Sequence, residues 1–368
     1  MIWLALPAVA AAAYWLLTIL AAWRWPRAVV ASGQRPGISI LKPVRGRDPH
    51  FYDAIRSHVL QQYSEFEILF GAADPDDPAL EDIRRLIAEF PEHRIRILLT
   101  STRLPNAKVG VLAELARQAR YPLLLINDSD IRVPPDYLRQ VAASLEGPQI
   151  GLVTCLYRAR ADAWPGRWEA LGIATEFVPS VLVARFIGLA EFACGATMLL
   201  RAEDLERIGG FESIGDYLGD DYQLGLRITG LGERVVFAPV VVETHLGGES
   251  WRHAWRHQLR WSRTIRVSRR GGYYGYAVTH ATFWSLVAFA CGAWPIGVIA
   301  LVLRLAGGVI AGQAILHDAS VARYFYLMPL RDLWGFAIWL CGLFGDTVDW
   351  RGERLRITAE GRITGVRW

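Results

Sequence analysis

Two aspartates are separated by a single serine in the stretch LLLINDSDIRVPPDYL, soon after an apolar run typical of a buried strand. Carboxylates spaced like Asp128 and Asp130 at the exit of a strand repel each other unless a cation lies between them. Their oxygen atoms suit Mg²⁺ or Mn²⁺, which keep coordination positions open for a diphosphate. We therefore predict a divalent-metal site at Asp128 and Asp130, with an aspartate-rich turn as the structural alternative.

Further carboxylates occur in the stretches FGAADPDDPA and GDDYQLG. Asp74 follows a second strand-like run; its neighbour Asp77 fits a helix N-cap, whereas Asp74 lies further from the helix start. Asp220 and Asp221 precede a helical stretch, where the helix dipole favours acidic residues. A carboxylate held there could equally accept a proton from an incoming hydroxyl, as a general base does.

The segment 251–270 is rich in arginine and aromatic residues. At helical spacing its basic and apolar residues form two stripes: Arg252, Arg256, Arg260 and Arg263 on one, and Trp251, Trp255 and Leu259 on the other. Such a helix lies in the headgroup region of a bilayer. Guanidinium groups also bind diphosphate well, so one or two of these arginines could serve a leaving diphosphate.

Strand-like runs alternate with helical stretches between residues 36 and 245. The runs are Ile38–Leu41, Phe66–Ala72, Ile95–Leu99, Leu123–Asn127 and Leu152–Cys155. This alternation predicts an α/β domain with a mostly parallel sheet flanked by helices. Ligands bind beyond the carboxyl ends of such strands. Lys42, Pro43 and Val44 end the first strand, where a nucleotide base would meet exposed backbone.

The N-terminal segment 2–23 carries no charge and is long enough to cross a bilayer as a helix. Arg24 and Arg27 follow the apolar run, which is the reverse of the order in a signal peptide. This order predicts a retained anchor over residues 1–25, with the N-terminus outside and the following chain inside.

The C-terminal part is largely apolar, with interruptions at Arg304, Arg331 and Asp332. The expected segments are two spans, at 277–293 and 295–316, and a weaker re-entrant or interfacial segment near 330–346. They are flanked by a basic interfacial region, 246–276, and a basic tail, 347–368. Three full crossings would place the tail outside, whereas its arginines favour the inside, so its side stays open.

Charge and cysteine content exclude other classes. The net charge of +4 over 368 residues is too mild to suggest nucleic-acid binding. The four cysteines are widely spaced and form no CxxC pair, which argues against a disulfide framework or a zinc site.

Taken in order, the motifs resemble those of the ceramide-glucosyltransferase-like glycosyltransferases. The likeness covers about residues 38–270 and the flanking membrane segments. The matching phrases are ISILKPVRGRDP, DPDDPA, DSDIRVPPDYL, GDDYQLG and the pair Arg260–Trp261. The resemblance implies a GT-A fold with N-terminal and C-terminal transmembrane helices. It also implies a UDP-sugar donor, a divalent metal, a lipid acceptor in the membrane and inversion at the anomeric carbon.

The resemblance assigns roles to single residues. Asp74 matches the family's first aspartate, near the uridine, and Asp128 the second. Asp221 matches the third, which is expected to be the catalytic base. Lys108, in PNAKVGVL, matches a lysine near the nucleotide. Asp130 completes a DxD pair where eukaryotic members commonly have glycine.

Two stretches depart from the family pattern. Arg260 and Trp261 match the closing motif, expected at the diphosphate and the acceptor, but its first position is His257 instead of Gln or Arg. The asparagines that often follow the family's lysine are replaced by Val109 and Gly110.

The phrases LVTCLYRA, EFVPSVLVAR and DDYQLGLRI resemble the bacterial hopanoid-associated branch. That branch implies transfer of N-acetylglucosamine from its UDP-sugar to bacteriohopanetetrol. It also implies a multi-pass protein of the bacterial inner membrane with the catalytic domain facing the cytoplasm. A ceramide glucosyltransferase that uses UDP-glucose is the alternative.

Three other classes compete. A polysaccharide synthase needs more membrane helices for a translocation channel than this sequence offers. A non-catalytic membrane scaffold gives no reason for carboxylates to gather at strand ends. A transporter does not fit a chain that is mostly a sheet domain.

Overall fold

A computed structural model describes residues 2–26, 36–247, 250–350 and 352–367. Arg27, which entered the membrane prediction, lies outside the described residues. The chain divides into two compact units, which we call the sheet unit and the helical unit. The sheet unit comprises Pro26–Tyr157 and Ala190–His245; the helical unit comprises Met1–Trp25, Arg158–Leu189 and Leu246–Trp368. The expected catalytic domain was continuous over 36–245, whereas 158–189 groups with the helical unit.

The sheet unit is built on an eight-stranded sheet of order β3-β2-β1-β4-β7-β6-β8-β5. Four neighbouring strands run parallel: β1 (Ile38–Val44), β2 (Phe66–Ala72), β3 (Ile95–Leu99) and β4 (Leu123–Ile126). The others are β5 (Ile131–Arg132), β6 (Ile150–Arg160), β7 (Met198–Arg201) and β8 (Arg234–His245). β7 pairs antiparallel with β4 and β6, and β5 with β8. The predicted α/β class is confirmed, and the antiparallel strands β7 and β8 are additions that the sequence analysis missed.

Strands β1, β2 and β4 are buried on both faces, and their successive side chains point to opposite sides of the sheet. Ile40 and Leu125 belong to one apolar core, and Leu41 and Leu124 to a second. The first core includes α2 (Phe51–Val59), α3 (Ala79–Glu89) and α5 (Tyr137–Ser144). The second includes α4 (Ala107–Arg117), α8 (Ala202–Arg207), η3 (Phe211–Ile214) and α9 (Asp220–Gly230).

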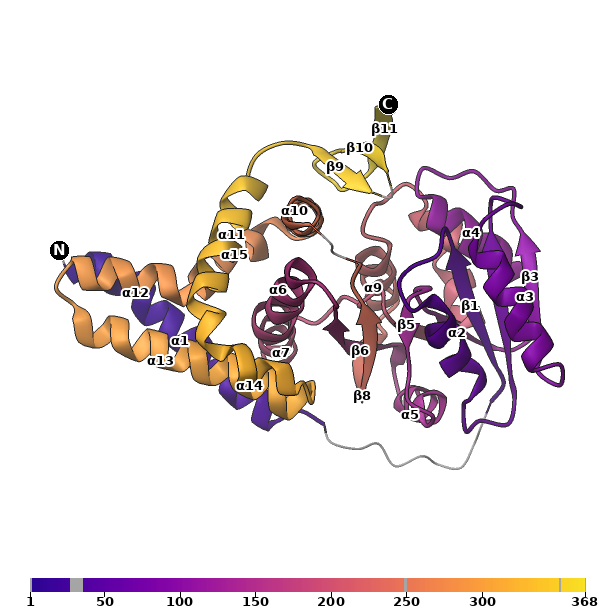
Figure 1. The fold of residues 1–368 in the computed structure, drawn as a ribbon, viewed down its shortest axis with the longest axis horizontal. Helices are drawn as coiled ribbons and strands as arrows, with labels where there is room; N and C mark the ends of the chain where they lie inside the picture. The colour runs from indigo at the N-terminus through magenta and orange to yellow at the C-terminus, as the bar shows by residue number, and fades with distance from the viewer. Residues whose placement is uncertain (1, 27–35, 248–249, 351, 368) are drawn as a thin grey trace. The chain divides into compact units, whose positions relative to one another are not determined.

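The helical unit combines long apolar helices with shorter ones. Its main helices are α1 (Leu6–Trp23), α6 (Trp164–Gly172), α7 (Val178–Phe186), α10 (Trp251–Ser268), α12 (Ala281–Ala290), α13 (Trp294–Ile310) and α15 (Met328–Gly342). Short elements join them: η1 (Ile2–Ala5), η2 (Ile173–Phe177), α11 (Arg270–Gly275), η4 (Tyr276–Thr279), η5 (Ala311–Ile315), α14 (Ala319–Tyr324) and η6 (Phe325–Leu327). Helices α1, α12 and α13 pack along one another (Figure 1).

Two described helices are long and apolar enough to cross a membrane, Leu6–Trp23 and Trp294–Ile315. They coincide with the predicted anchor and with the predicted span 295–316. Helix α12 has 10 residues and α15 has 15, fewer than the roughly 20 that a straight crossing needs. The number of crossings therefore stays a prediction.

The basic tail is folded. Residues 347–367 form a three-stranded antiparallel sheet in the order β11-β10-β9, apart from Arg351, which is not described. Its strands are β9 (Thr347–Trp350), β10 (Glu353–Ile357) and β11 (Ile363–Arg367). β9 contacts α10. Alternation of charged and apolar residues in ERLRITAEGRI carries this strand signal, which the sequence analysis left unused.

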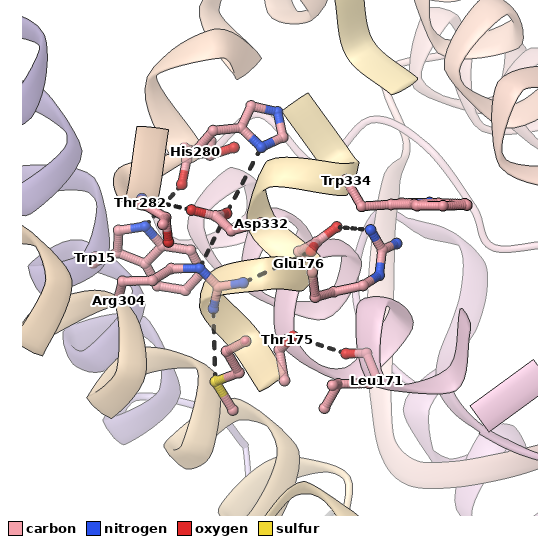
Figure 2. A network of polar contacts seen from close by, with 12 residues as sticks. Trp15, Leu171, Thr175, Glu176, His280, Thr282, Arg304, Asp332 and Trp334 are labelled. Carbon is pink, nitrogen blue, oxygen red and sulfur yellow. Dashed lines mark hydrogen bonds and ion pairs between the residues drawn. The ribbon is translucent and has the colours of Figure 1, made fainter. Parts of the chain in front are cut away.

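A network of buried charges lies inside the helical unit (Figure 2). Arg304 of α13 and Asp332 of α15 form an ion pair, with Arg304 Nε 3.2 Å from Asp332 Oδ1. Arg331 pairs with Glu176 of the π-helical turn η2, with NH1 3.2 Å from Oε2. All four side chains are less than a tenth exposed. Arg304, Arg331 and Asp332, which interrupt the apolar sequence, thus form a set with Glu176 in which two positive charges balance two negative ones.

Other groups tie this network to more helices. The Arg304 guanidinium lies 4.3 Å from the centre of the Trp15 ring on α1. The backbone N–H of Thr282 on α12 donates to Asp332 Oδ2 at 2.6 Å, and Arg331 donates to Gln258 of α10 at 3.0 Å. The polar contacts therefore join α1, α10, α12, α13 and α15.

Candidate active site

Loops after three adjacent parallel strands hold predicted site residues. Because β2, β1 and β4 are neighbours, their carboxyl ends meet on one edge of the sheet. Lys42, Pro43 and Val44 end β1, Asp74 lies two residues past β2, and Asp128 lies two residues past β4. The predicted placement of these motifs at strand ends is confirmed.

The ammonium of Lys108 joins two acidic motifs. It lies 2.8 Å from Asp128 Oδ1 and 3.1 Å from Asp220 Oδ2. Lys108 stands in the first turn of α4, and Asp220 is the first residue of α9. The structure thus brings Lys108, Asp128 and the GDDYQLG motif together, although Lys108 and Asp220 stand 112 positions apart in the chain.

The Asn106 side chain anchors the first turn of α4, which carries Lys108. Its side-chain oxygen accepts from the backbone N–H of Val109 at 3.3 Å, which caps α4. Its amide nitrogen donates to the carbonyl of Tyr217 at 2.8 Å, just before α9. Gly110 admits the close backbone approach here, since a Cβ would lie 2.8 Å from the Thr102 carbonyl oxygen.

Asp221 faces the same cluster. Its Oδ2 accepts from the backbone N–H of Gly195 at 3.1 Å, and its Oδ1 accepts from the N–H of Tyr222 at 2.7 Å. A Cβ added at Gly195 would lie 3.5 Å from both Asp128 Oδ2 and Asp221 Oδ2. Gly195 therefore lies between these two carboxylates, and we call Lys108, Asp128, Asp220 and Asp221 with Gly195 the aspartate cluster.

Burial and mutual repulsion shift the acid groups. Burial raises the pKa of Asp221, and the charge of Asp220 raises it further, against the lowering effect of Lys108. Burial, followed by the charge of Asp128, raises the pKa of Asp130 to about 6. Burial lowers the pKa of Lys108, but the carboxylates of Asp128 and Asp220 outweigh it and hold the pKa above its usual value. The site therefore carries more negative than positive charge.

The residues fit the predicted divalent cation. Asp128 is half-buried and Asp130 follows it after one residue, with one Asp130 oxygen accepting from the hydroxyl of Thr244 on β8. Burial is the main cause of the raised pKa of Asp130, and the charge of Asp128 adds to it, so a nearby cation would stabilise the ionised pair. Hard divalent cations favour such oxygen donors.

Lys42 is turned into the protein. Its side chain is fully buried, and Nζ donates to Asn127 Oδ1 at 2.9 Å and to the Asp128 carbonyl at 3.0 Å. Burial lowers the pKa of Lys42 to about 7, against the raising effect of Asp130 and Asp128. These two hydrogen bonds hold the loop that follows β4 in place. Nucleotide contact by Lys42, Pro43 and Val44 stays a prediction.

Asp74 and Asp77 occupy different positions. Asp74 is exposed, and its Oδ1 accepts from the N–H of Asp76 at 2.9 Å within a turn. Asp77 is buried; its oxygens accept from Ala79 at the start of α3 and from Gly46 after β1. The N-cap position of α3 falls on Pro78, one residue after the predicted Asp77, but the Asp77 carboxylate does accept from the first N–H of the helix. A role for Asp74 near a uridine stays a prediction.

The residues of the closing motif lie on α10 in the helical unit. The His257 ring pairs with Glu169 of α6, and Trp261 lies against His257, with ring centroids 4.7 Å apart. Arg260 lies on the same helix. Their proximity to the aspartate cluster stays a prediction, because the cluster belongs to the sheet unit.

Comparison with known proteins decides the family. Residues 3–363 match glycosyl transferase family 21. The chain belongs to glycosyl transferase family 21. This confirms the resemblance to ceramide-glucosyltransferase-like enzymes at the level of the family.

Among relatives of this family 21 protein, ceramide glucosyltransferase 1 of Caenorhabditis elegans is 31% identical over 200 residues. That match covers 54% of this chain and 43% of the relative. The ceramide glucosyltransferase of Candida albicans is 32% identical over 124 residues, covering 30% of this chain and 23% of the relative. The chain thus spans less than half the length of these relatives.

A solved structure confirms the predicted GT-A-type fold. The mannosyltransferase of Pyrobaculum calidifontis, solved with GDP-mannose and Mn²⁺, superposes with a TM-score of 0.58 at 20% identity. The match covers 92% of this chain and 97% of that one. At this identity the likeness concerns the fold alone.

Several groups at this edge of the sheet were not predicted from the sequence. Gly195 was assigned no role, and Asp220 was placed at a helix start but not as the partner of Lys108. Asp48 accepts from the hydroxyl of Ser129 at 2.9 Å, and Asn127 receives the Lys42 ammonium. Asp48 and Asn127 both stand in the stretches that follow a strand, and that position was the available signal.

Proposed function

We propose that this family 21 protein is an inverting lipid glycosyltransferase that moves a sugar from a UDP-sugar to the hydroxyl of a membrane lipid. The observation that carries the proposal is the meeting of Asp128, Lys108 and the GDDYQLG motif at one sheet edge. Family membership supports sugar transfer. The ceramide glucosyltransferase relatives and the two apolar helices support a lipid acceptor.

Asp221 is the proposed general base. The lipid oxygen attacks the anomeric carbon opposite the UDP, and Asp221 takes the hydroxyl proton as the new carbon–oxygen bond forms. The bond from the anomeric carbon to the phosphate oxygen breaks, and UDP departs with the electron pair. A raised pKa supports this role, because a base with a pKa nearer neutrality holds the proton better.

The remaining site residues bind and orient. Asp128 and Asp130 would hold a divalent metal, which when bound neutralises charge on the departing diphosphate. Lys108 keeps the Asp128 carboxylate in place through their 2.8 Å contact. We assign the base and sugar end of the nucleotide to Pro43, Val44 and Asp74, while the buried Lys42 holds the loop after β4. Arg260 is assigned to the diphosphate, and His257 and Trp261 to the acceptor.

Curated relatives favour UDP-glucose and ceramide as donor and acceptor. Transfer of N-acetylglucosamine to bacteriohopanetetrol is the second candidate, which rests on the phrases LVTCLYRA, EFVPSVLVAR and DDYQLGLRI. Purified protein incubated with each donor and each acceptor, followed by mass spectrometry of the lipids, tests both. Glucosylceramide is the expected product; N-acetylglucosaminyl-hopanoid would select the second candidate, and no glycolipid in any pairing would contradict lipid transfer.

We also propose that the chain is a multi-pass protein of a bacterial inner membrane with the sheet unit in the cytoplasm. Arg24 directly after the apolar helix Leu6–Trp23 supports this side. Alkaline phosphatase fused after residue 245 should be inactive in cells, since that enzyme needs the periplasm. An active fusion would reverse the orientation.

A further inference from the structure

A small cavity opens within the helical unit, between α10 and the C-terminal sheet. Its volume is about 70 Å³, which leaves room for several waters or one tetrahedral oxyanion. It is lined by Arg256, Leu259, Arg260, Arg263, Thr347, Val348, Asp349 and Arg354. Four of the eight lining residues are arginines, against one carboxylate.

Two elements supply the arginines. Arg256, Arg260 and Arg263 recur at spacings of four and three residues, so they share one face of α10. Arg354 comes from β10, where the antiparallel register sets it opposite Asp349 of β9. The arginine stripe noted in the sequence therefore faces a folded tail across a cavity.

Groups of the protein balance this charge only in part. Asp349 lies 3.6 Å from Arg256, and both side chains are about half exposed, which makes the pair weak. Arg263 donates to the backbone carbonyl of Phe344 at 3.1 Å. Burial lowers the pKa of Arg263, and the charges of Arg266 and Arg354 lower it further, against Asp346. Within the part of the chain that the structure describes, Arg354 has no carboxylate partner.

We propose that this cavity is a binding site for a phosphate group. Guanidinium forks match the oxygens of phosphate in pairs, and several of them around one concave space favour a dianion or monoanion over water. The phosphate comes either from the headgroup of an anionic lipid or from a free phosphate or diphosphate. Arg260 is shared with the proposed transfer reaction, where it is assigned to the diphosphate, whereas Arg256 and Arg354 have no part in that reaction.

The test compares two arginines of one strand. Arg354→Gln removes a lining charge; Arg356→Gln removes a charge from the same strand outside the cavity, where Arg356 pairs with Asp346. Full-length protein in neutral detergent is titrated with dihexanoyl-phosphatidylglycerol, with inorganic phosphate and with UDP, and binding is read by calorimetry. Thermal melting of each variant checks folding, and Arg354→Lys tests whether charge alone suffices.

We expect the short-chain anionic lipid to bind about tenfold more weakly to Arg354→Gln than to Arg356→Gln, since one charge-assisted hydrogen bond is lost. Arg354→Lys should lie between them. If phosphate and UDP show the difference and the lipid does not, the site is a free-phosphate site. Equal binding of all three probes by Arg354→Gln and Arg356→Gln, with both variants folded, overturns the proposal. Because no turnover is measured, failure of the transfer reaction would leave this result unaffected.

Discussion

Two clusters of charged residues in this protein differ in charge balance and in exposure to solvent. In the aspartate cluster, Lys108 faces Asp128 and Asp220, with Asp221 close by, and Asp128 keeps 39% of its side chain exposed. In the helical unit, two arginines face two carboxylates, and Arg304 is fully buried. The first cluster has an excess of negative charge and access to solvent, whereas the second is balanced and closed.

The two clusters differ because one stabilises the fold and the other is open to ligands. Charges taken out of water must be paired, because the cost of an unpaired buried ion is several kcal/mol. The Arg304–Asp332 network satisfies that demand internally and joins helices. In the aspartate cluster, one lysine faces several carboxylates at the edge of the sheet. A bound cation and substrate would supply the missing positive charge and contacts there.

The largest expected effect is on stability in the helical unit. Arg304→Met leaves Asp332 buried without its cation and should lower the free energy of unfolding by about 3–5 kcal/mol. Denaturant unfolding in detergent micelles, followed by tryptophan fluorescence, measures it.

The double variant Arg304→Met/Asp332→Leu is the matched control. Removing both charges should restore most of the lost stability, since an apolar pair of similar size is tolerated. A double variant less stable than the single one would show that the network does more than balance charge.

The next effect is on the cluster's lysine. Lys108→Met removes the partner of Asp128 and Asp220, yet the site is partly open to water. The cost in stability should therefore be smaller, about 1–3 kcal/mol. Added Mg²⁺ should recover part of it in the melting temperature. If Lys108→Met costs as much as Arg304→Met, the two clusters do not differ in the way we describe.

The raised pKa of Asp130, beside the aspartate cluster, should make the stability of the protein depend on pH. A carboxylate whose pKa is about 6 in the folded state and about 4 when unfolded holds its proton better when folded. Between these pH values the folded state binds more protons, so stability falls as pH rises from about 4 to about 6. Melting curves in EDTA measure this decline, which Asp130→Asn should reduce. Mn²⁺ at pH 7 should reverse it in the wild type; no response to Mn²⁺ argues against the metal site.

The smallest effect on stability is expected at Gly195. The added methyl of Gly195→Ala meets Asp128 and Asp221 at ordinary contact distance, so stability should change by about 0.5 kcal/mol or less. The KM for the UDP-sugar should still rise, because the methyl lies between the two carboxylates. Gly230→Ala, which adds a methyl in open space, is the control and should leave KM unchanged.

Sequence patterns predicted the parallel part of the fold well, because burial on both faces produces runs such as Phe66–Ala72 that are hard to mistake. They failed for β7 and β8, whose pairing depends on partners far away in the chain. The site residues show the same contrast between local patterns, which the sequence reveals, and long-range contacts, which it does not. Asp128 was recognisable from its strand, but the contact of Lys108 with Asp220 depends on the docking of α4 beside α9. Likewise Glu176 became visible as a charge partner only through the π-helical turn that presents it to Arg331.

We propose that the aspartate cluster performs the transfer chemistry and that Asp221 is its base. Sugar transfer by Asp221→Asn, measured beside Asp216→Asn as a nearby exposed control, tests it most directly. We expect a loss of about 10²–10⁴-fold in kcat for Asp221→Asn, with UDP binding and melting temperature close to wild type. Little change in kcat is expected for Asp216→Asn. Near-normal turnover in Asp221→Asn would show that Asp221 is not the base.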